Sequence, residues 1–194
     1  MSSDGRQTTR VAIYGGSFNP PHVGHVLAAC YVLSTCDVDE VLVVPTFQHP
    51  FAKELASFDD RFALCEAAFA QLPGARVSRV EADLGGESRT LRTLEHLAAA
   101  HPDWEMRLMI GADILGDAPK WHGFDRVREL APLIVLGRAG VARPDAPEPV
   151  LPRVSSTSIR ELLANGRGDE LAPLVPRAVL AEIERRRLYR RGTP

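Results

Sequence analysis

The segment RVAIYGGSFNPPHVGHVLAACYVL (residues 10–33) passes from a short apolar run, through a loop of glycines and prolines, into a helical pattern. The run at 10–14 predicts a buried strand, and the two adjacent prolines prevent a helix from starting before His22. Gly15 and Gly16 lack a Cβ, so they allow a tight turn and a close approach of a ligand to the backbone. This segment therefore starts an alternation of strand and helix.

Apolar runs typical of strands recur along the chain, at residues 10–14, 41–45, 75–81, 106–110 and 133–136. Segments with helical periodicity lie between them. Strands that alternate with helices, and are themselves almost continuously apolar, indicate a parallel sheet covered on both faces. The expected fold class is α/β, a doubly wound, Rossmann-like parallel sheet with helices on both faces, in which ligands bind beyond the carboxyl ends of the strands.

Capping residues and turn residues divide the rest of the chain. Ser57 and Asp60 have the spacing of a capping box at the start of a helix. The segment 139–153 carries four prolines and is expected to be a surface loop. Beyond it, Gly166 is placed to end one helix and Pro176 to occupy the first turn of the next.

The length of 194 residues suits one domain with a substantial core. We expect a disordered tail at 1–9 and a single domain at 10–194, in which 154–194 forms a small helical C-terminal extension. The net charge of −2 gives no basic field that would attract nucleic acid or an anionic membrane. The basic run Arg185–Arg191 is interpreted as a solvated helix face. Whether the chain forms a homo-oligomer is left open.

The three cysteines show no framework spacing and favour a reducing compartment. Cys30 and Cys65 fall in apolar helical patterns and are expected to be buried. The N-terminus is polar, and no apolar stretch approaches the roughly 18 residues of a membrane span. These features predict a cytoplasmic protein without a membrane segment.

The two histidines of the opening loop are its unusual chemical feature. His22 and His25, at i and i+3, can share one face of the first helical turn. Unpaired N–H groups at a helix N-terminus bind anions, and imidazoles beside them suit phosphate oxygens. The plainer alternative is a pair of locally hydrogen-bonded histidines. A zinc site would need further ligands that no Cys or HExxH helix supplies, so we favour phosphate binding.

The stretch SSTSIR (155–160) is a second candidate anion site. Its hydroxyl residues stand at a helix start, and Arg160 follows one turn later, able to hold a polyphosphate with two hydrogen bonds. By itself this pattern is typical of an ordinary capped helix. Together with the histidine loop, it predicts the far wall of a nucleoside triphosphate site.

GGSFNPPHVGH and SSTSIR together resemble the nucleotidyltransferase superfamily with the HxGH signature, and within it the bacterial nicotinate-nucleotide adenylyltransferase family. GADIL (111–115), KWH (120–122), Arg138 and the ending LVPRAVLAEIERRRLY support the resemblance, which extends from residue 10 to 189. It implies that the phosphate of nicotinate mononucleotide attacks the α-phosphorus of ATP and releases pyrophosphate. It also implies Mg²⁺ as a cofactor with ATP, no covalent enzyme intermediate and no residue acting as a metal ligand.

The resemblance implies a role for each matching position. The implied catalytic residues are His22, His25, Lys53 and Arg160. The implied ATP-binding residues are Gly15, Gly16, Ser17, Phe18, Gly111, Asp113, Ser155, Ser156 and Thr157. The implied acceptor-binding residues are Ser88, Arg89, Thr90, Trp121 and Arg138. Alternatively, Asp113 caps a helix, Trp121 belongs to the core or its rim, and Arg138 is a surface arginine.

The chain departs from the family pattern on the acceptor side. SRTLRTL (88–94) has Arg89 where the family has tyrosine and Arg92 where it has aspartate, and PFAK (50–53) keeps Lys53 without the histidine before it. These departures leave other acceptors open: nicotinamide mononucleotide, phosphopantetheine or another phosphorylated compound. A nucleotide-binding regulator without turnover is the alternative from a different class.

Overall fold

The computed structural model describes residues 8–48, 55–118, 121–139 and 147–190. In chain order its elements are β1 (Thr9–Gly16), α1 (Val23–Thr35), β2 (Glu40–Pro45), α2 (Phe58–Phe69), β3 (Ala75–Val77), α3 (Val80–Leu84), α4 (Thr90–Ala100), β4 (Trp104–Gly111), α5 (Phe124–Leu130), β5 (Leu133–Arg138), β6 (Pro149–Leu151), α6 (Ser156–Ala164), the 3₁₀ helix η2 (Gly168–Leu171) and α7 (Arg177–Arg186).

The strands of the described residues form one parallel sheet in the order β3-β2-β1-β4-β5-β6. The chain builds outward from β1 to β2 and β3, then returns to the other side of β1 with β4. This order reverses between β1 and β4, and in doubly wound sheets ligands bind at the carboxyl ends of the strands on either side of such a reversal. The predicted fold class is confirmed.

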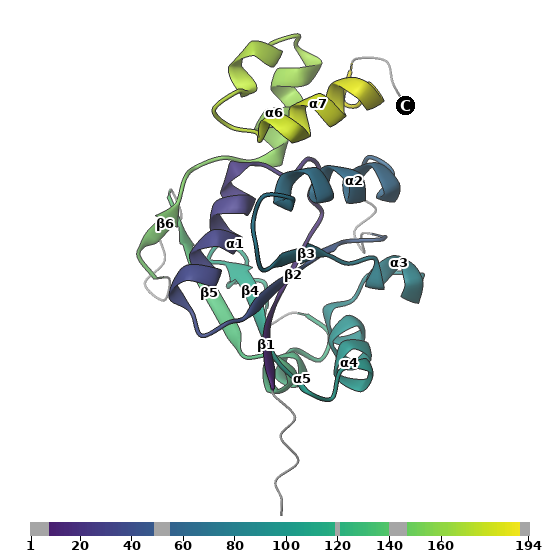
Figure 1. Cartoon of the computed structure of the whole chain (residues 1–194), viewed down its shortest axis with the longest axis vertical. Coiled ribbons are helices and arrows are strands. Elements are labelled where there is room, and N and C mark those ends of the chain that lie inside the picture. The colour runs from purple at the N-terminus through teal and green to yellow at the C-terminus, as the bar shows by residue number, and fades with distance from the viewer. Residues whose placement is uncertain (1–7, 49–54, 119–120, 140–146, 191–194) are drawn as a thin grey trace, which may run out of the picture.

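Helices cover both faces of the sheet (Figure 1). Successive strand residues point to opposite faces, so Ala12 and Val43 pack with α1, α2 and the C-terminal helices, whereas Val11 and Ile13 pack with α3, α4 and α5. Burial on both faces explains why the strands are almost continuously apolar.

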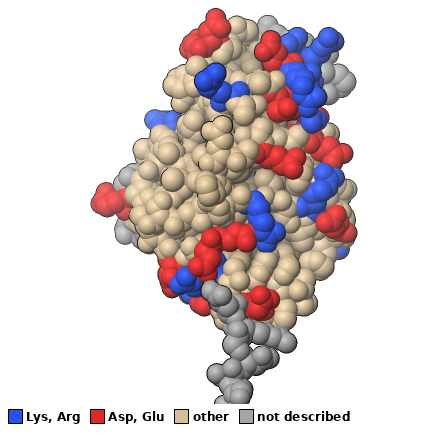
Figure 2. Space-filling model, viewed as in Figure 1, with Lys and Arg blue, Asp and Glu red and all other residues tan. Residues whose placement is uncertain are grey.

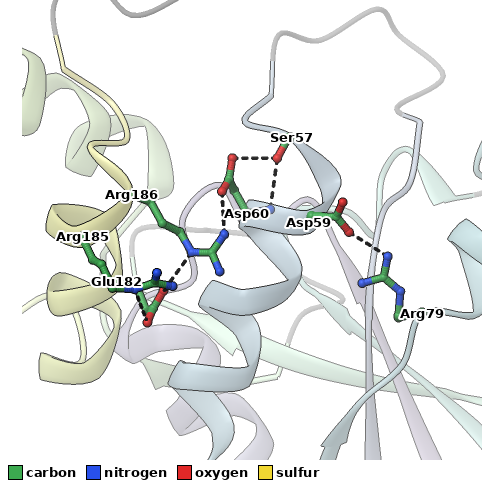
Figure 3. A network of polar contacts seen from close by, with 7 residues as sticks. All are labelled: Ser57, Asp59, Asp60, Arg79, Glu182, Arg185 and Arg186. Carbon is green, nitrogen blue, oxygen red and sulfur yellow. Dashed lines mark hydrogen bonds and ion pairs between the residues drawn. The ribbon is translucent and has the colours of Figure 1, made fainter.

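The C-terminal helices pack on the face that α1 and α2 cover. Ile159 of α6 and Val179 of α7 are buried in the same core as α1 and α2. Figure 3 shows how α7 is joined to α2 by charged side chains: Arg186 donates to Asp60 of α2 at 2.9 Å and to Glu182 at 2.8 Å. The end of the chain is therefore fixed against the helix that follows β2.

Charges of both signs are mixed on the surface that Figure 2 shows. Basic and acidic side chains alternate along the side of the molecule where α7, α2 and α3 lie, so neither sign forms a continuous field on this face. Among the described residues, no helix combines the length and the apolar character needed to cross a membrane.

Two strand predictions differ from the structure. Of the run at 75–81 only Ala75–Val77 pairs as β3, because the Ser78 Oγ accepts the N–H of Val80 at 3.2 Å and the chain turns into α3. The expected loop at 139–153 contains β6, which pairs with β5, while residues 140–146 lie outside the described part. Strands as short as β3 and β6, of 3 residues each, carry too little periodicity to be recognised.

Three smaller expectations were also wrong. β1 begins at Thr9, inside the expected tail, and Pro176 is the N-cap of α7 rather than a first-turn residue. Cys65 is buried as expected, but Cys30 is exposed. Because α1 is apolar on nearly all sides, its sequence does not define which face turns inward. The face that the structure buries consists of Gly24, Ala28, Ala29 and Val32, and does not include Cys30.

Candidate active site

A cavity of about 410 Å³ opens beyond the carboxyl ends of β1 and β4. Every residue predicted for ATP binding or for catalysis, other than Lys53, lines it; Lys53 lies outside the described residues. The β1 side contributes the glycine loop and α1, and the β4 side contributes Gly111 and Asp113. The start of α6 closes the third side with Ser155, Ser156, Thr157 and Arg160. The structure therefore brings the two predicted anion-binding stretches together.

The histidine pair lies at the N-terminus of α1. His22 is the N-cap residue, and its N–H donates to the Nδ1 of His25 at 3.1 Å. The two rings stack with centroids 3.7 Å apart. Because the His25 Nδ1 accepts a hydrogen bond, a neutral ring carries its proton on Nε2.

Phe18 holds the loop between β1 and α1 in an unusual conformation. Its φ of 45° lies in the left-handed region, which costs a non-glycine residue roughly 1–2 kcal/mol. The ring is buried and packs edge-on against Tyr14 at 5.4 Å and against His25 at 5.0 Å. A Cβ on Gly16 would lie 3.2 Å from this ring, so a glycine leaves it room. Aromatic packing thus fixes the backbone beside the cavity.

Two side chains tie the start of α6 to this loop. The Ser156 Oγ donates to the carbonyl of Pro20 at 2.8 Å, and the Arg160 Nη1 donates to the carbonyl of Asn19 at 2.7 Å. Ser155 caps α6, accepting the Ser158 N–H at 3.2 Å. A guanidinium has five N–H donors, so Arg160 can hold Asn19 and still meet a phosphate in the cavity.

Asn19 is a buried polar residue of the cavity wall that sequence reasoning missed. Its side chain is 2% exposed, and its Oδ1 accepts the Tyr189 hydroxyl at 2.8 Å and the Ala56 N–H at 3.2 Å. Burial raises the pKa of Tyr189, which keeps this hydroxyl protonated and able to donate. Asn19 therefore connects the loop to the segment before α2 and to the end of the chain.

Gly24 and Arg61 were also missed. A Cβ at Gly24 would lie 2.9 Å from the Val154 Cγ1 and 3.1 Å from the His22 Cε1, so only a glycine lets α1 approach the segment before α6 this closely. Arg61 is 1% exposed and donates to backbone carbonyls of three segments. The available signal was an arginine on the apolar face of a helix, three residues after Phe58.

Of the predicted acceptor residues, the four whose side chains the structure describes, Ser88, Arg89, Thr90 and Trp121, do not line the cavity. The Ser88 Oγ accepts the N–H groups of Phe47 at 2.9 Å and of Gln48 at 3.2 Å, and donates to Glu81. Trp121 packs against the core and against Phe124, with ring centroids 6.3 Å apart. Thr90 is the first residue of α4, and the side chain of Arg138 is outside the described part.

Of the two departures from the family pattern, PFAK (50–53) lies outside the described residues. In SRTLRTL both substituted arginines bind within their own part of the chain. Arg89 donates to Glu87 at 2.7 Å on the surface. Arg92 donates to the carbonyls of Leu84 at 2.7 Å and Gly85 at 2.5 Å, and so satisfies the C-terminal end of α3. Each arginine has a local structural partner.

The fit of a divalent metal can be judged from the cavity. Within the described ranges no group of three or more His, Cys, Asp or Glu side chains is placed to hold a metal ion. Asp113 does line the cavity. Mg²⁺ commonly binds through one or two carboxylates, several waters and the phosphates of its nucleotide. The residues therefore fit a magnesium ion that is held mainly by ATP.

Comparison with known proteins agrees with this geometry. Residues 13–162 match the family model described as cytidylyltransferase-like. A protein from Anaeromyxobacter dehalogenans (strain 2CP-C) named "Probable nicotinate-nucleotide adenylyltransferase" is 50% identical over 192 residues, which cover 97% of this chain and 99% of that protein. The chain belongs to the nicotinate-nucleotide adenylyltransferase family.

Other members of the nicotinate-nucleotide adenylyltransferase family extend the match. A protein of the same name from Myxococcus xanthus (strain DK1622) is 47% identical over 185 residues, 95% of this chain and 96% of its own. The solved structure of Plasmodium falciparum nicotinic acid mononucleotide adenylyltransferase complexed with NaAD has a TM-score of 0.80 at 17% identity, covering 93% of this chain and 97% of that one. At that identity the likeness concerns the fold.

Proposed function

We propose that this enzyme transfers the adenylyl group of ATP to nicotinate mononucleotide, a step of NAD biosynthesis. The observation that carries the proposal is that His22 and His25 of α1 and Arg160 of α6 line one cavity, at the point where the strand order reverses. Donors from two helix N-termini converge there, as binding of a polyphosphate requires. The names of the relatives support nicotinate mononucleotide as the acceptor.

The reaction is one displacement at the α-phosphorus of ATP. A phosphate oxygen of the acceptor forms the new P–O bond while the bond to the bridging oxygen of the β-phosphate breaks. Pyrophosphate leaves with that electron pair, and the product is nicotinate adenine dinucleotide. Such transfers depend on positioning and charge stabilisation, so no protein nucleophile is required.

Each wall of the cavity has a proposed part in this step. His25, donating through Nε2, and His22 meet the charge that grows on the phosphate oxygens. Ser17 and Phe18, which line the cavity in the same loop, offer their backbone N–H groups to the α-phosphate. Arg160, with the hydroxyl residues at the start of α6, holds the leaving pyrophosphate. Asp113, two residues beyond the end of β4, accepts hydrogen bonds from the ribose hydroxyls.

Mg²⁺ completes the ATP side in this proposal. Bound mainly to the phosphates and to water, it would neutralise part of their charge and polarise the α-phosphate. The free cysteines suit a reducing, cytoplasmic compartment. The C-terminal helices belong to the same proposed domain as the sheet, because they share its core.

The acceptor site is proposed to lie on the β2 side of the cavity. The β4 side holds Gly111 and Asp113, which are assigned to the nucleoside of ATP. The second substrate is therefore expected on the opposite side, toward β2. Arg89 and Arg92 have partners within their own segment, so they give no reason to assign a different acceptor.

An acceptor panel at fixed ATP and Mg²⁺ tests this function. Pyrophosphate release should be fastest with nicotinate mononucleotide and much slower with nicotinamide mononucleotide or phosphopantetheine. Release with none of these acceptors would favour a nucleotide-binding regulator, and a preference for another acceptor would replace the substrate assignment.

A further inference from the structure

Arg61 is a buried arginine that holds three separate segments of backbone. It lies on α2 and is 1% exposed. Its Nε donates to the carbonyl of Ala56 at 2.9 Å, its Nη1 to the carbonyl of Ser17 at 3.0 Å, and its Nη2 to the carbonyl of Phe47 at 3.4 Å. Ser17 belongs to the loop after β1 and Phe47 to the loop after β2.

Burying a guanidinium that has no ion-pair partner costs free energy, so we expect such an arginine where the position has a use. In the part of the chain that the structure describes, no carboxylate forms an ion pair with Arg61, and burial lowers its pKa. Its neighbours on the buried face of α2 include Leu64 and Cys65, so an apolar side chain would suit the same position. A buried polar residue that breaks the apolar pattern of a helix is expected mainly at functional or strained sites.

Phe47 is held from both sides by charged groups. Its carbonyl accepts from Arg61, and its N–H donates to the Oε2 of Glu81 at 3.0 Å and to the Oγ of Ser88 at 2.9 Å. Thr93 donates to the other oxygen of Glu81 at 3.3 Å. The position of the Phe47 backbone therefore depends on side chains from α2, α3 and the segment before α4.

The loop after β2 is also joined directly to the wall of the cavity. The N–H of Thr46 donates to the carbonyl of Gly16 at 2.9 Å, and Gly16 lines the cavity. Arg61 is a second connection between the same two loops, through Ser17 and Phe47. The spacing between the two loops is thus set by a backbone contact and by one guanidinium.

We infer that Arg61 is a positioning residue that fixes the loop after β2 relative to the loop after β1, and thereby aligns the acceptor phosphate with the α-phosphorus of ATP. The inference rests on the proposed function, since alignment matters only when two substrates meet. Arg61 does not touch the cavity; it acts through the two loops.

The two loops depend on Arg61 to different degrees. The loop after β1 is also held by Arg160 and Tyr189 at Asn19 and by Ser156 at Pro20. Among the described residues, the donor to the carbonyl of Phe47 is Arg61. Loss of the guanidinium should therefore displace the acceptor side and leave ATP binding nearly intact.

The test compares Arg61→Lys and Arg61→Met with wild type and with Arg79→Met. The Arg61 guanidinium packs on the Phe58 ring at 5.7 Å, and Arg79 is a matched control because its guanidinium packs on the same ring at 5.1 Å but donates to the surface carboxylate of Asp59. A lysine keeps the charge but cannot reach three carbonyls in fixed directions. Displacing reacting groups by about 1 Å can cost roughly 100-fold, so we expect kcat to fall about 10-fold in Arg61→Lys and about 100-fold in Arg61→Met.

The readouts separate positioning from folding and from the proposed function. KM for nicotinate mononucleotide should rise in Arg61→Lys, while the Kd for ATP, measured by calorimetry, stays unchanged. Arg79→Met should have the wild-type kcat, acceptor KM and Kd for ATP. Arg61→Lys is decisive if Arg61→Met does not fold. If kcat and the acceptor KM of Arg61→Lys equal those of the wild-type enzyme, whatever the melting temperature of the variant, the inference is overturned. Turnover by the wild-type enzyme would still support the proposed function. A wild-type enzyme that is inactive with every acceptor would refute both.

Discussion

The two nitrogens of His25 have different roles, and substitutions can remove them one at a time. In His25→Asn the Oδ1 stands the same number of bonds from the backbone as the Nδ1, so it can still accept the N–H of His22. In His25→Gln the amide nitrogen stands where the Nε2 donor was. His25→Ala removes both groups.

The two losses have different sizes and appear in different measurements. Removing one preorganised donor from a phosphoryl transition state is expected to lower kcat about 10²–10³-fold, equivalent to roughly 2.7–4 kcal/mol. Removing the hydrogen bond to the N-cap residue of α1 should destabilise the fold by about 1 kcal/mol, the scale of a lost helix cap. For a chain of this length that lowers Tm by roughly 2–4 °C.

The assay measures kcat by pyrophosphate release at saturating ATP and nicotinate mononucleotide, and Tm by a thermal melt of each variant. We expect His25→Asn to have the wild-type Tm and a lower kcat. We expect His25→Gln to have a lower Tm and a higher kcat than His25→Asn. His25→Ala should lose both. The reasoning is refuted if His25→Asn retains wild-type turnover, because the donor assigned to Nε2 would then have no part in the transition state.

Three further predictions follow from other contacts. Gly24→Ala should lower kcat at least 10-fold, because the new Cβ displaces the His22 ring or Val154 by clashing with both, and full activity would contradict this packing. Hydrogen bonds from two arginines lower the pKa of Glu182 to about 2, so its stabilising effect is present above the carboxyl's unfolded pKa and is lost as pH falls toward 2. The Tm difference between wild type and Glu182→Gln should therefore be positive at pH 7 and shrink between about pH 5 and 2; a difference that does not change with pH would disprove the pairing. Trp121→Ala should lower Tm and leave KM for the acceptor and for ATP unchanged, because the ring packs on the core and on Phe124; a higher KM for the acceptor alone would show that the ring contacts the acceptor.

The part of the site that sequence predicts best is the part whose chemistry is local. The histidines of α1 and the hydroxyl cap of α6 each read as an anion site because spacing within one helical turn decides the geometry. The fold was equally accessible, since strands buried on both faces must be apolar throughout. That both stretches line one cavity was predicted from their combination, and the structure brings them together.

The missed residues act across long stretches of chain. Asn19 accepts from Tyr189, 170 residues away, and Arg61 binds Ser17, 44 residues away. Gly24 matters because Val154 approaches it, which no local pattern shows. Ser88 shows the converse: its motif was recognised, but its hydroxyl holds the backbone of the loop after β2.

The most direct test of the proposed reaction follows the α-phosphorus itself. ATP labelled at the α-phosphorus is incubated with Mg²⁺, nicotinate mononucleotide and the enzyme, and the products are separated. The proposed displacement predicts that the label enters nicotinate adenine dinucleotide while the pyrophosphate stays unlabelled, at a rate that falls steeply in His25→Asn. Absence of label from the dinucleotide, or equal labelling when the acceptor is nicotinamide mononucleotide, would contradict it.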